Sequence, residues 1–121
     1  MVKGIGVDIV DIDRFKNINN DQDFINQILN DYEIPVVLTR IPKHVQIAKA
    51  FALKEAMMKA LGTGLYYGSY WHNIEISELW EIKLSGFLKN ISDEMKINKI
   101  NSSTVQTKNY VSAVVILEGY I

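Results

Sequence analysis

The chain has 121 residues, a formal net charge of −1 at neutral pH and no cysteine. This length allows one domain with a real core, and the lack of cysteine excludes disulfides, a thiol nucleophile and a cysteine zinc site. Hydrophobic residues make up 48% of the chain, and no leader-like or membrane-spanning run is recognisable, so we expect a single domain over residues 1–121 that acts in the cytoplasm.

Residues 2 to 10 predict a β-strand, because their side chains alternate in character. Three aliphatic side chains would point to one face, and Gly4, Gly6 and Asp8 to the other. Two missing side chains beside a carboxylate would leave room for a ligand. The plainer interpretation is an edge strand whose glycines mark a bulge and whose end is marked by Asp8.

A helix is expected after this strand, starting near Arg14, capped by Asp11 or Asp13 and running to about Leu29. Asparagines at positions 19 and 20 suggest an interruption in it.

A second helical start is predicted at Asn30, because Glu33 supplies an acid three residues later. Pro35 and Pro42 would punctuate this loosely helical region before a long helix. The long helix would end at Gly62, which can adopt the left-handed conformation of a helix cap.

The long helix sets three charges into a segment whose other residues suggest burial. At 100° per residue, Lys54 falls near the middle of a broad apolar arc, with Glu55 and Lys59 at its flank. The opposite side has small residues that would let another backbone approach closely. They are Ala48, Ala52, Ala56 and Ala60. Two interpretations are open: a core helix whose lysine stems reach water, or a site for an anion and a metal.

Positive charge is concentrated between residues 40 and 59. The basic residues there are Arg40, Lys43, Lys49, Lys54 and Lys59, against the single acid Glu55. This excess suits a polyphosphate ligand or an acidic partner better than the net charge suggests. Nucleic acid is not an expected partner, because no aromatic-interleaved basic strand or recognition helix accompanies the charge.

The rest of the chain predicts a hairpin over residues 74–76 and 79–84, a helix over 87–96, and closing strands at 104–106 and 111–117. We therefore expect an α+β fold in which a small antiparallel sheet packs with a long central helix.

Two motifs follow one another along the chain. The first is Gly4-Ile-Gly6-Val-Asp8, followed by an acid and Arg14; the second is Phe51-Ala-Leu-Lys54-Glu55-Ala with Lys59-Ala-Leu-Gly62-Thr63-Gly64. With weaker matches at residues 71–76 and 110–118, this pattern resembles the holo-acyl-carrier-protein synthase family of 4′-phosphopantetheinyl transferases. The resemblance covers nearly the whole chain.

The resemblance implies a magnesium-dependent transfer of 4′-phosphopantetheine from coenzyme A to a serine of an apo acyl carrier protein. The reaction would release adenosine 3′,5′-bisphosphate and serve fatty acid biosynthesis. Asp8 and Glu55 would be the magnesium ligands, since magnesium prefers one or two carboxylates together with substrate oxygens and water. Lys59 would be catalytic, either contacting the phosphates or easing removal of the serine proton.

The resemblance also implies binding roles. Coenzyme A would be bound by Lys54, Gly62, Thr63, Gly64, Gln106 and Thr107. Arg14 would bind the carrier protein, while His44 and His72 match no motif position and are expected to be surface or structural residues. Short members of the family complete the site from a neighbour, so a homotrimer with coenzyme A at each subunit interface is expected. The closing strand and the alanine row would be its contact surfaces, unless they are buried inside the monomer.

Two positions depart from the family pattern. The family usually has an arginine where Ala50 stands and a histidine where Gln106 stands. They support one alternative, a degenerate member that binds coenzyme A or a carrier protein without turnover. Another alternative, a piece of a sugar-kinase-type ATPase suggested by Gly-x-Gly-x-Asp, conflicts with the short chain, because such folds need two lobes.

Overall fold

The structure is a computed structural model, and it describes residues 1–18, 21–63 and 70–121. The first half contains β1 (Val2–Asp11), the 3-10 helix η1 (Ile12–Phe15), and the α-helices α1 (Gln22–Ile28), α2 (Glu33–Leu38) and α3 (Lys43–Leu61). The second half contains the 3-10 helix η3 (Trp71–Asn73), β2 (Ile74–Ile76), β3 (Ile82–Leu84), α4 (Gly86–Glu94), β4 (Ile97–Gln106) and β5 (Tyr110–Gly119).

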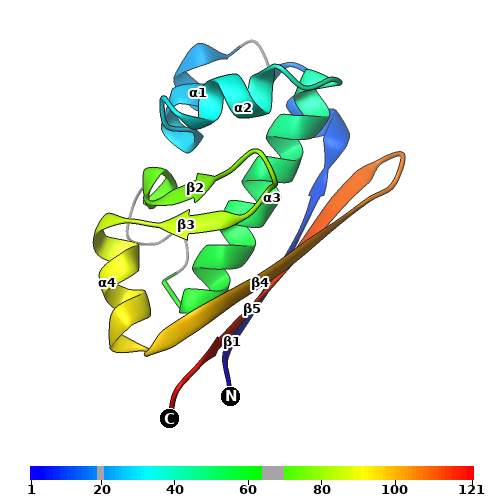
Figure 1. Ribbon diagram of the computed structural model, residues 1–121. Helices are drawn as coiled ribbons and strands as arrows, with labels where there is room; N and C mark the ends of the chain where they lie inside the picture. The colour runs from blue at the N-terminus through cyan, green and yellow to red at the C-terminus, as the bar shows by residue number, and fades with distance from the viewer. Residues whose placement is uncertain (19–20, 64–69) are drawn as a thin grey trace.

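The strands form two antiparallel sheets, one with the order β1-β5-β4 and one with β2 and β3. Helix α3 lies between them, with the larger sheet on one side and the β2–β3 hairpin and α4 on the other (Figure 1). This confirms the predicted α+β fold with a long central helix. Within the described ranges, no helix is both long and apolar enough to span a bilayer.

Strand β4 is longer than predicted, because it starts at Ile97 and not near Thr104. Most of its side chains are polar or half-exposed, so its pattern gives little sign of a strand. The hydrogen-bonded ladder with β5 holds it in place.

The single helix predicted from about Arg14 to Leu29 is replaced by a 3-10 helix and a separate α-helix. Asp11 caps the short η1, since its Oδ1 accepts a hydrogen bond of 2.9 Å from the Asp13 amide. A separate helix, α1, then starts at Gln22 with Asp21 as its cap. The expected interruption at positions 19 and 20 lies outside the described residues.

Two other predicted helix ends are confirmed. The Glu33 amide donates to Asn30 Oδ1 (2.9 Å) and the Asn30 amide donates to Glu33 Oε1 (3.0 Å), which is the reciprocal bonding of a capping box. At the end of α3, Gly62 has a φ of 77° and supplies the left-handed cap.

Strand β1 approaches α3 closely at its two glycines. A Cβ added to Gly6 would lie 1.8 Å from the Ala56 carbonyl oxygen, and one on Gly4 would lie 2.2 Å from that of Ala60. The prediction that these glycines leave room for a ligand is therefore wrong, because the alanine side of α3 fills the space. The same packing buries the alanine row inside the chain, so the expectation that it forms a subunit contact is wrong as well.

The opposite face of β1 is apolar and exposed. Ile5, Val7 and Ile9 are 55–64% exposed there, and Val105 on β4 is 63% exposed. Because α3 covers only the inner face of the larger sheet, this outer face has no cover among the described elements.

Candidate functional site

Strand β1 and helix α3 bring two carboxyl groups together. The side chain of Asp8 lies on the inner face of β1 and is only 9% exposed to solvent. Glu55 is half-buried in the middle of α3. Burial, and after it the neighbouring Asp8 carboxylate, raise the pKa of Glu55 to about 7. Two neighbouring carboxylates repel one another, so the pair favours a cation between them or a shared proton.

Two basic side chains surround this pair. Lys59 lies one turn after Glu55 on α3, and its Nζ is 2.9 Å from Asp8 Oδ1 and 3.1 Å from the Val7 carbonyl oxygen. The Arg14 guanidinium lies 5.2 Å from the centre of the Phe51 ring. Both cations oppose the rise in the pKa of Glu55, which places them within electrostatic reach of its carboxyl. The fold thus joins the two sequence motifs in one site.

One atom of the site has no protein partner. Asp8 Oδ2 is buried and receives no hydrogen bond from any residue that the structure describes. Leaving such an atom unsatisfied costs about 1–3 kcal/mol or more. A divalent cation would satisfy it and would also neutralise the repulsion from Glu55.

The donor set fits magnesium better than zinc. Over the described ranges, no group of three or more His, Asp or Glu side chains gathers around one point. Magnesium keeps several waters and is commonly bound by one or two carboxylates together with substrate phosphate oxygens. Asp8 and Glu55 provide such a pair.

Lys54 does not belong to this site, which corrects the expectation that it binds the nucleotide. Its side chain is fully buried, and its Nζ lies 2.7 Å from Glu33 Oε1, 2.6 Å from the Ile28 carbonyl and 3.0 Å from the Trp71 carbonyl. Burial lowers the pKa of Lys54, and the charge of Glu33 opposes this. All three ammonium protons have internal acceptors, so Lys54 neither reaches water nor meets a ligand.

Nothing in the sequence indicates that Glu33 has a second role. Its Oε2 accepts a bond of 2.9 Å from the Ile76 amide, while Oε1 is shared by Lys54 and the Asn30 amide. One carboxylate therefore links α2, β2 and α3. Because a buried lysine needs an acidic partner, the sequence could have predicted that Lys54 pairs with an acid. It could not have shown which acid forms the pair.

The glycine-rich end of α3 is also occupied. The amides of Gly62 and Thr63 donate to the carbonyls of Lys59 and Met58, and the Thr63 hydroxyl donates to Met58 as well. These groups complete the helix cap, so the expectation that the Gly62 and Thr63 amides bind the nucleotide is corrected. Gly64 lies outside the described residues.

The other predicted positions lie apart from the carboxylates. Gln106 pairs with Val111, which pairs with Val10 of β1, so Gln106 is two strands and about 10 Å across the sheet from β1. Thr107 follows in the hairpin turn, where its hydroxyl accepts from the Tyr110 amide. His72 is bonded to the Asn26 carbonyl, in keeping with the structural role expected for it.

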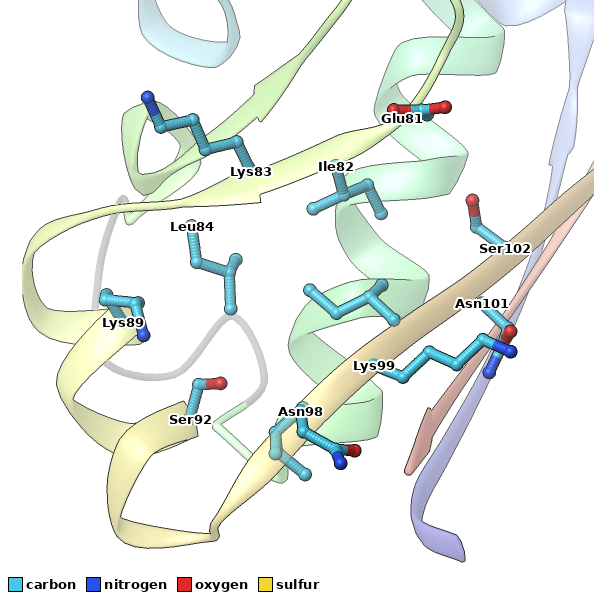
Figure 2. Close-up of a pocket in the computed structure, with 12 residues that line it drawn as sticks. Glu81, Ile82, Lys83, Leu84, Lys89, Ser92, Asn98, Lys99, Asn101 and Ser102 are labelled. Carbon is cyan, nitrogen blue, oxygen red and sulfur yellow. The ribbon is translucent and has the colours of Figure 1, made fainter. Parts of the chain in front are cut away.

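A pocket of about 650 Å³ lies between β3, α4 and β4, away from the carboxylate pair (Figure 2). Lys83, Lys99 and the buried Ser92 are among its lining residues, and Glu81 stands at one end. None of the predicted site residues lines it. Glu81 is the one acidic residue among those that line the pocket, so the pocket has no pair of carboxylates like Asp8 and Glu55.

Comparison with known proteins gives a consistent result. The family model of the 4′-phosphopantetheinyl transferase superfamily matches residues 4–115. The holo-[acyl-carrier-protein] synthase of Buchnera aphidicola is 41% identical over 122 residues, covering 95% of this chain and 96% of the relative. A crystal structure of the Neisseria meningitidis enzyme of that name aligns with a TM-score of 0.85 at 31% identity, covering 98% and 99% of the two chains. The Helicobacter pylori enzyme, solved with coenzyme A, aligns with a TM-score of 0.77 at 32% identity, covering 94% and 99%.

Proposed function

This chain belongs to the 4′-phosphopantetheinyl transferase superfamily and is a phosphopantetheinyl transferase, and from that premise we propose that it is a holo-acyl-carrier-protein synthase. It moves the 4′-phosphopantetheine arm of coenzyme A to a serine of an apo acyl carrier protein, in the cytoplasm and in support of fatty acid biosynthesis. The names of the relatives and the coenzyme A complex of the Helicobacter pylori protein support both substrates. The observation that carries the proposal is the buried, unsatisfied Asp8 Oδ2 beside Glu55.

Asp8 and Glu55 would hold the magnesium ion of the reaction. The bound ion would supply charge neutralisation at the pyrophosphate of coenzyme A and at the charge that develops during transfer. The intact set of carboxylates and cations around it favours a working enzyme over a degenerate member that only binds.

The reaction exchanges one phosphorus–oxygen bond for another. The serine oxygen forms a bond to the phosphorus that carries pantetheine, the bond from that phosphorus to the bridging oxygen breaks, and adenosine 3′,5′-bisphosphate leaves. The serine proton is released. Lys59 has its ammonium beside Asp8 and half in solvent, which lets it contact the phosphate oxygens and stabilise the leaving group.

The proposed function is tested by incubating the chain with magnesium, coenzyme A and an apo acyl carrier protein. The intact mass of the carrier should rise by one phosphopantetheine group, with release of one adenosine 3′,5′-bisphosphate per carrier. A carrier whose acceptor serine is replaced by alanine is the control. If the mass of the unmodified carrier stays constant while the chain is folded, the chain is not this enzyme.

Replacing Lys59 by alanine should lower kcat by roughly 10²-fold, because a preorganised cation at the phosphates is lost. The melting temperature should change little when magnesium is present to compensate the buried Asp8 carboxylate, since the Lys59 side chain itself is 51% exposed. Lys89→Ala is the matched control, because Lys89 is a half-exposed helical lysine paired with Asp93 on α4. A lower melting temperature with unchanged kcat would show that Lys59 is only structural.

Arg14 is proposed to bind the carrier protein. It is exposed within electrostatic reach of Glu55 and can attract an acidic partner, which affects association more than the chemical step. Arg14→Glu should therefore raise the KM for the carrier at least about tenfold and leave the KM for coenzyme A nearly unchanged. Equal increases in both constants would instead place Arg14 at the donor.

The chain is proposed to form a homotrimer with shared sites. The exposed apolar face of β1 offers a surface for a second copy, and Gln106 lies too far from the carboxylates of its own chain to act with them directly. Sedimentation should give a mass near three chains. Asp8→Asn chains mixed with Gln106→Ala chains should recover part of the activity that each lacks alone. A fully active monomer would contradict the shared site.

A further inference from the structure

One side chain of α3 ties the helix to three other elements. The Nζ of Lys54 donates to three acceptors, which are the Glu33 carboxylate in α2 and the carbonyls of Ile28 at the end of α1 and Trp71 in η3. Lys54 and Glu33 are fully buried, and both lie outside the carboxylate site.

These contacts continue from Glu33 to strand β2. Glu33 Oε2 accepts a hydrogen bond of 2.9 Å from the Ile76 amide, and the side-chain amide of Asn30 donates to Glu75 Oε1 at 3.1 Å. The ammonium of Lys54 and both oxygens of Glu33 are therefore bonded within the protein. We call Lys54, Glu33 and Asn30 the Lys54 network. A buried network whose groups are satisfied fixes one arrangement of the elements that it joins.

Stability alone does not account for a buried ion pair at this place. Removing two charges from water is costly, and such pairs are often no more stabilising than well-packed apolar residues of the same volume. A buried pair can instead contribute by fixing the register of the elements around it. At Lys54, the element whose position is fixed is the central helix α3.

Helix α3 is held from two sides (Figure 1). On one side, the carbonyls of Ala56 and Ala60 approach the glycines of β1 so closely that a Cβ would not fit between them. On the other side, the Lys54 network joins the helix to α1, α2 and β2. Together these contacts fix the rotation of α3 about its axis.

This rotation determines where Glu55 lies. Glu55 follows Lys54 directly, about 100° further around the helix, and its carboxyl lies beside that of Asp8. A side-chain tip is about 5–6 Å from the helix axis, so a rotation of about 10° moves it by about 1 Å. Magnesium requires near-ideal octahedral geometry with oxygens at about 2.0–2.1 Å, so a shift of this size would weaken its binding.

We propose that Glu33 and Lys54 are positioning residues for the metal site. They hold α3 in the rotation that places the Glu55 carboxylate beside Asp8, although neither of them touches the metal or the substrate. This inference rests on the proposed function, in which Asp8 and Glu55 bind magnesium. The pair therefore acts on the reaction through the affinity for magnesium.

The test uses Lys54→Met combined with Glu33→Gln, which removes the buried pair and leaves no buried charge unpaired. In calorimetric titrations without coenzyme A, the Kd for magnesium should increase about tenfold or more, as is typical when the support of a metal ligand is lost. The magnesium concentration for half-maximal transfer should increase by the same factor, while the KM for the carrier protein stays the same. If the double variant binds magnesium as tightly as the unmodified chain, the proposal is wrong.

Leu88→Ala separates positioning from a general loss of stability. Leu88 is fully buried in α4, outside the Lys54 network, so its truncation should lower the melting temperature and leave the Kd for magnesium unchanged. An equal increase of this Kd in Leu88→Ala would overturn the proposal, because any destabilised chain would then bind magnesium weakly.

The same titrations distinguish this inference from the transferase assignment. If the unmodified chain binds magnesium, the double variant binds it more weakly and neither transfers phosphopantetheine, the proposed function fails and the positioning role stands. If the unmodified chain transfers the group but the double variant binds magnesium equally well, the positioning role alone fails.

Discussion

Asp8→Asn and Glu55→Gln should each reduce transfer to the carrier protein by roughly 10²–10³-fold while the chain remains folded. Each change keeps the shape of the side chain and removes one ligand charge from a preorganised site, which is worth about 3–4 kcal/mol in the transition state. The measurement is kcat/KM from the intact mass of the carrier at limiting magnesium. Near-normal rates in either variant would remove these carboxylates from the metal site.

Glu55→Gln should also change how the stability of the folded chain depends on pH. The pKa of Glu55 is about 7 in the folded chain and about 4.5 as an ordinary carboxyl, so the folded state binds the proton more tightly. Without metal, the contribution of Glu55 to stability is therefore full below pH 4.5 and is lost as the pH rises through 7. Glu55→Gln should not show this loss.

At pH 8, metal-free Glu55→Gln should melt no lower than the unmodified chain. Added magnesium should raise the melting temperature of the unmodified chain but not that of the variant, because the ion binds only the intact site. A variant that melts lower at every pH would identify Glu55 as a structural residue.

The largest effect on stability is expected at Lys54. Lys54→Met leaves the buried Glu33 carboxylate without its counter-charge, which typically costs about 3–5 kcal/mol. In a chain of this size, the melting temperature should fall by at least about 10 °C. Chemical denaturation should show the same loss as a lower midpoint.

Two controls separate the buried pair from ordinary charge loss. Lys89→Met removes an exposed pair and should change stability by no more than about 1 kcal/mol. Lys54→Met combined with Glu33→Gln should recover part of the loss, since no buried charge remains unpaired. If Lys54→Met lowers kcat but not the melting temperature, Lys54 acts on the substrate after all.

The sequence was sufficient for the elements that rest on local patterns. The capping box at Asn30, the left-handed cap at Gly62 and the strand around Asp8 all depend on residues close in the chain. The convergence of Asp8, Glu55 and Lys59 followed from the resemblance. Periodicity alone left a metal site and a covered core helix equally open.

The errors concern long-range partners. The alanine row of α3 correctly indicated the close approach of another backbone, which is that of β1, whereas the interpretation of Gly4 and Gly6 as room for a ligand was wrong. Lys54 correctly stood out as a buried charge, but its partner Glu33 lies 21 residues away and only the tertiary fold brings the two together. The contacts of Arg40 and Lys49 with the Trp80 ring were missed for the same reason, because the three residues come from separate segments.

The most direct test of the central claim is the rate of carrier modification as a function of free magnesium. The unmodified chain should transfer no phosphopantetheine in the presence of a chelator, and magnesium should restore the rate to saturation. Asp8→Asn should show little transfer at any magnesium concentration that saturates the unmodified chain. Transfer at an unchanged rate in chelator would contradict a metal site formed by Asp8 and Glu55.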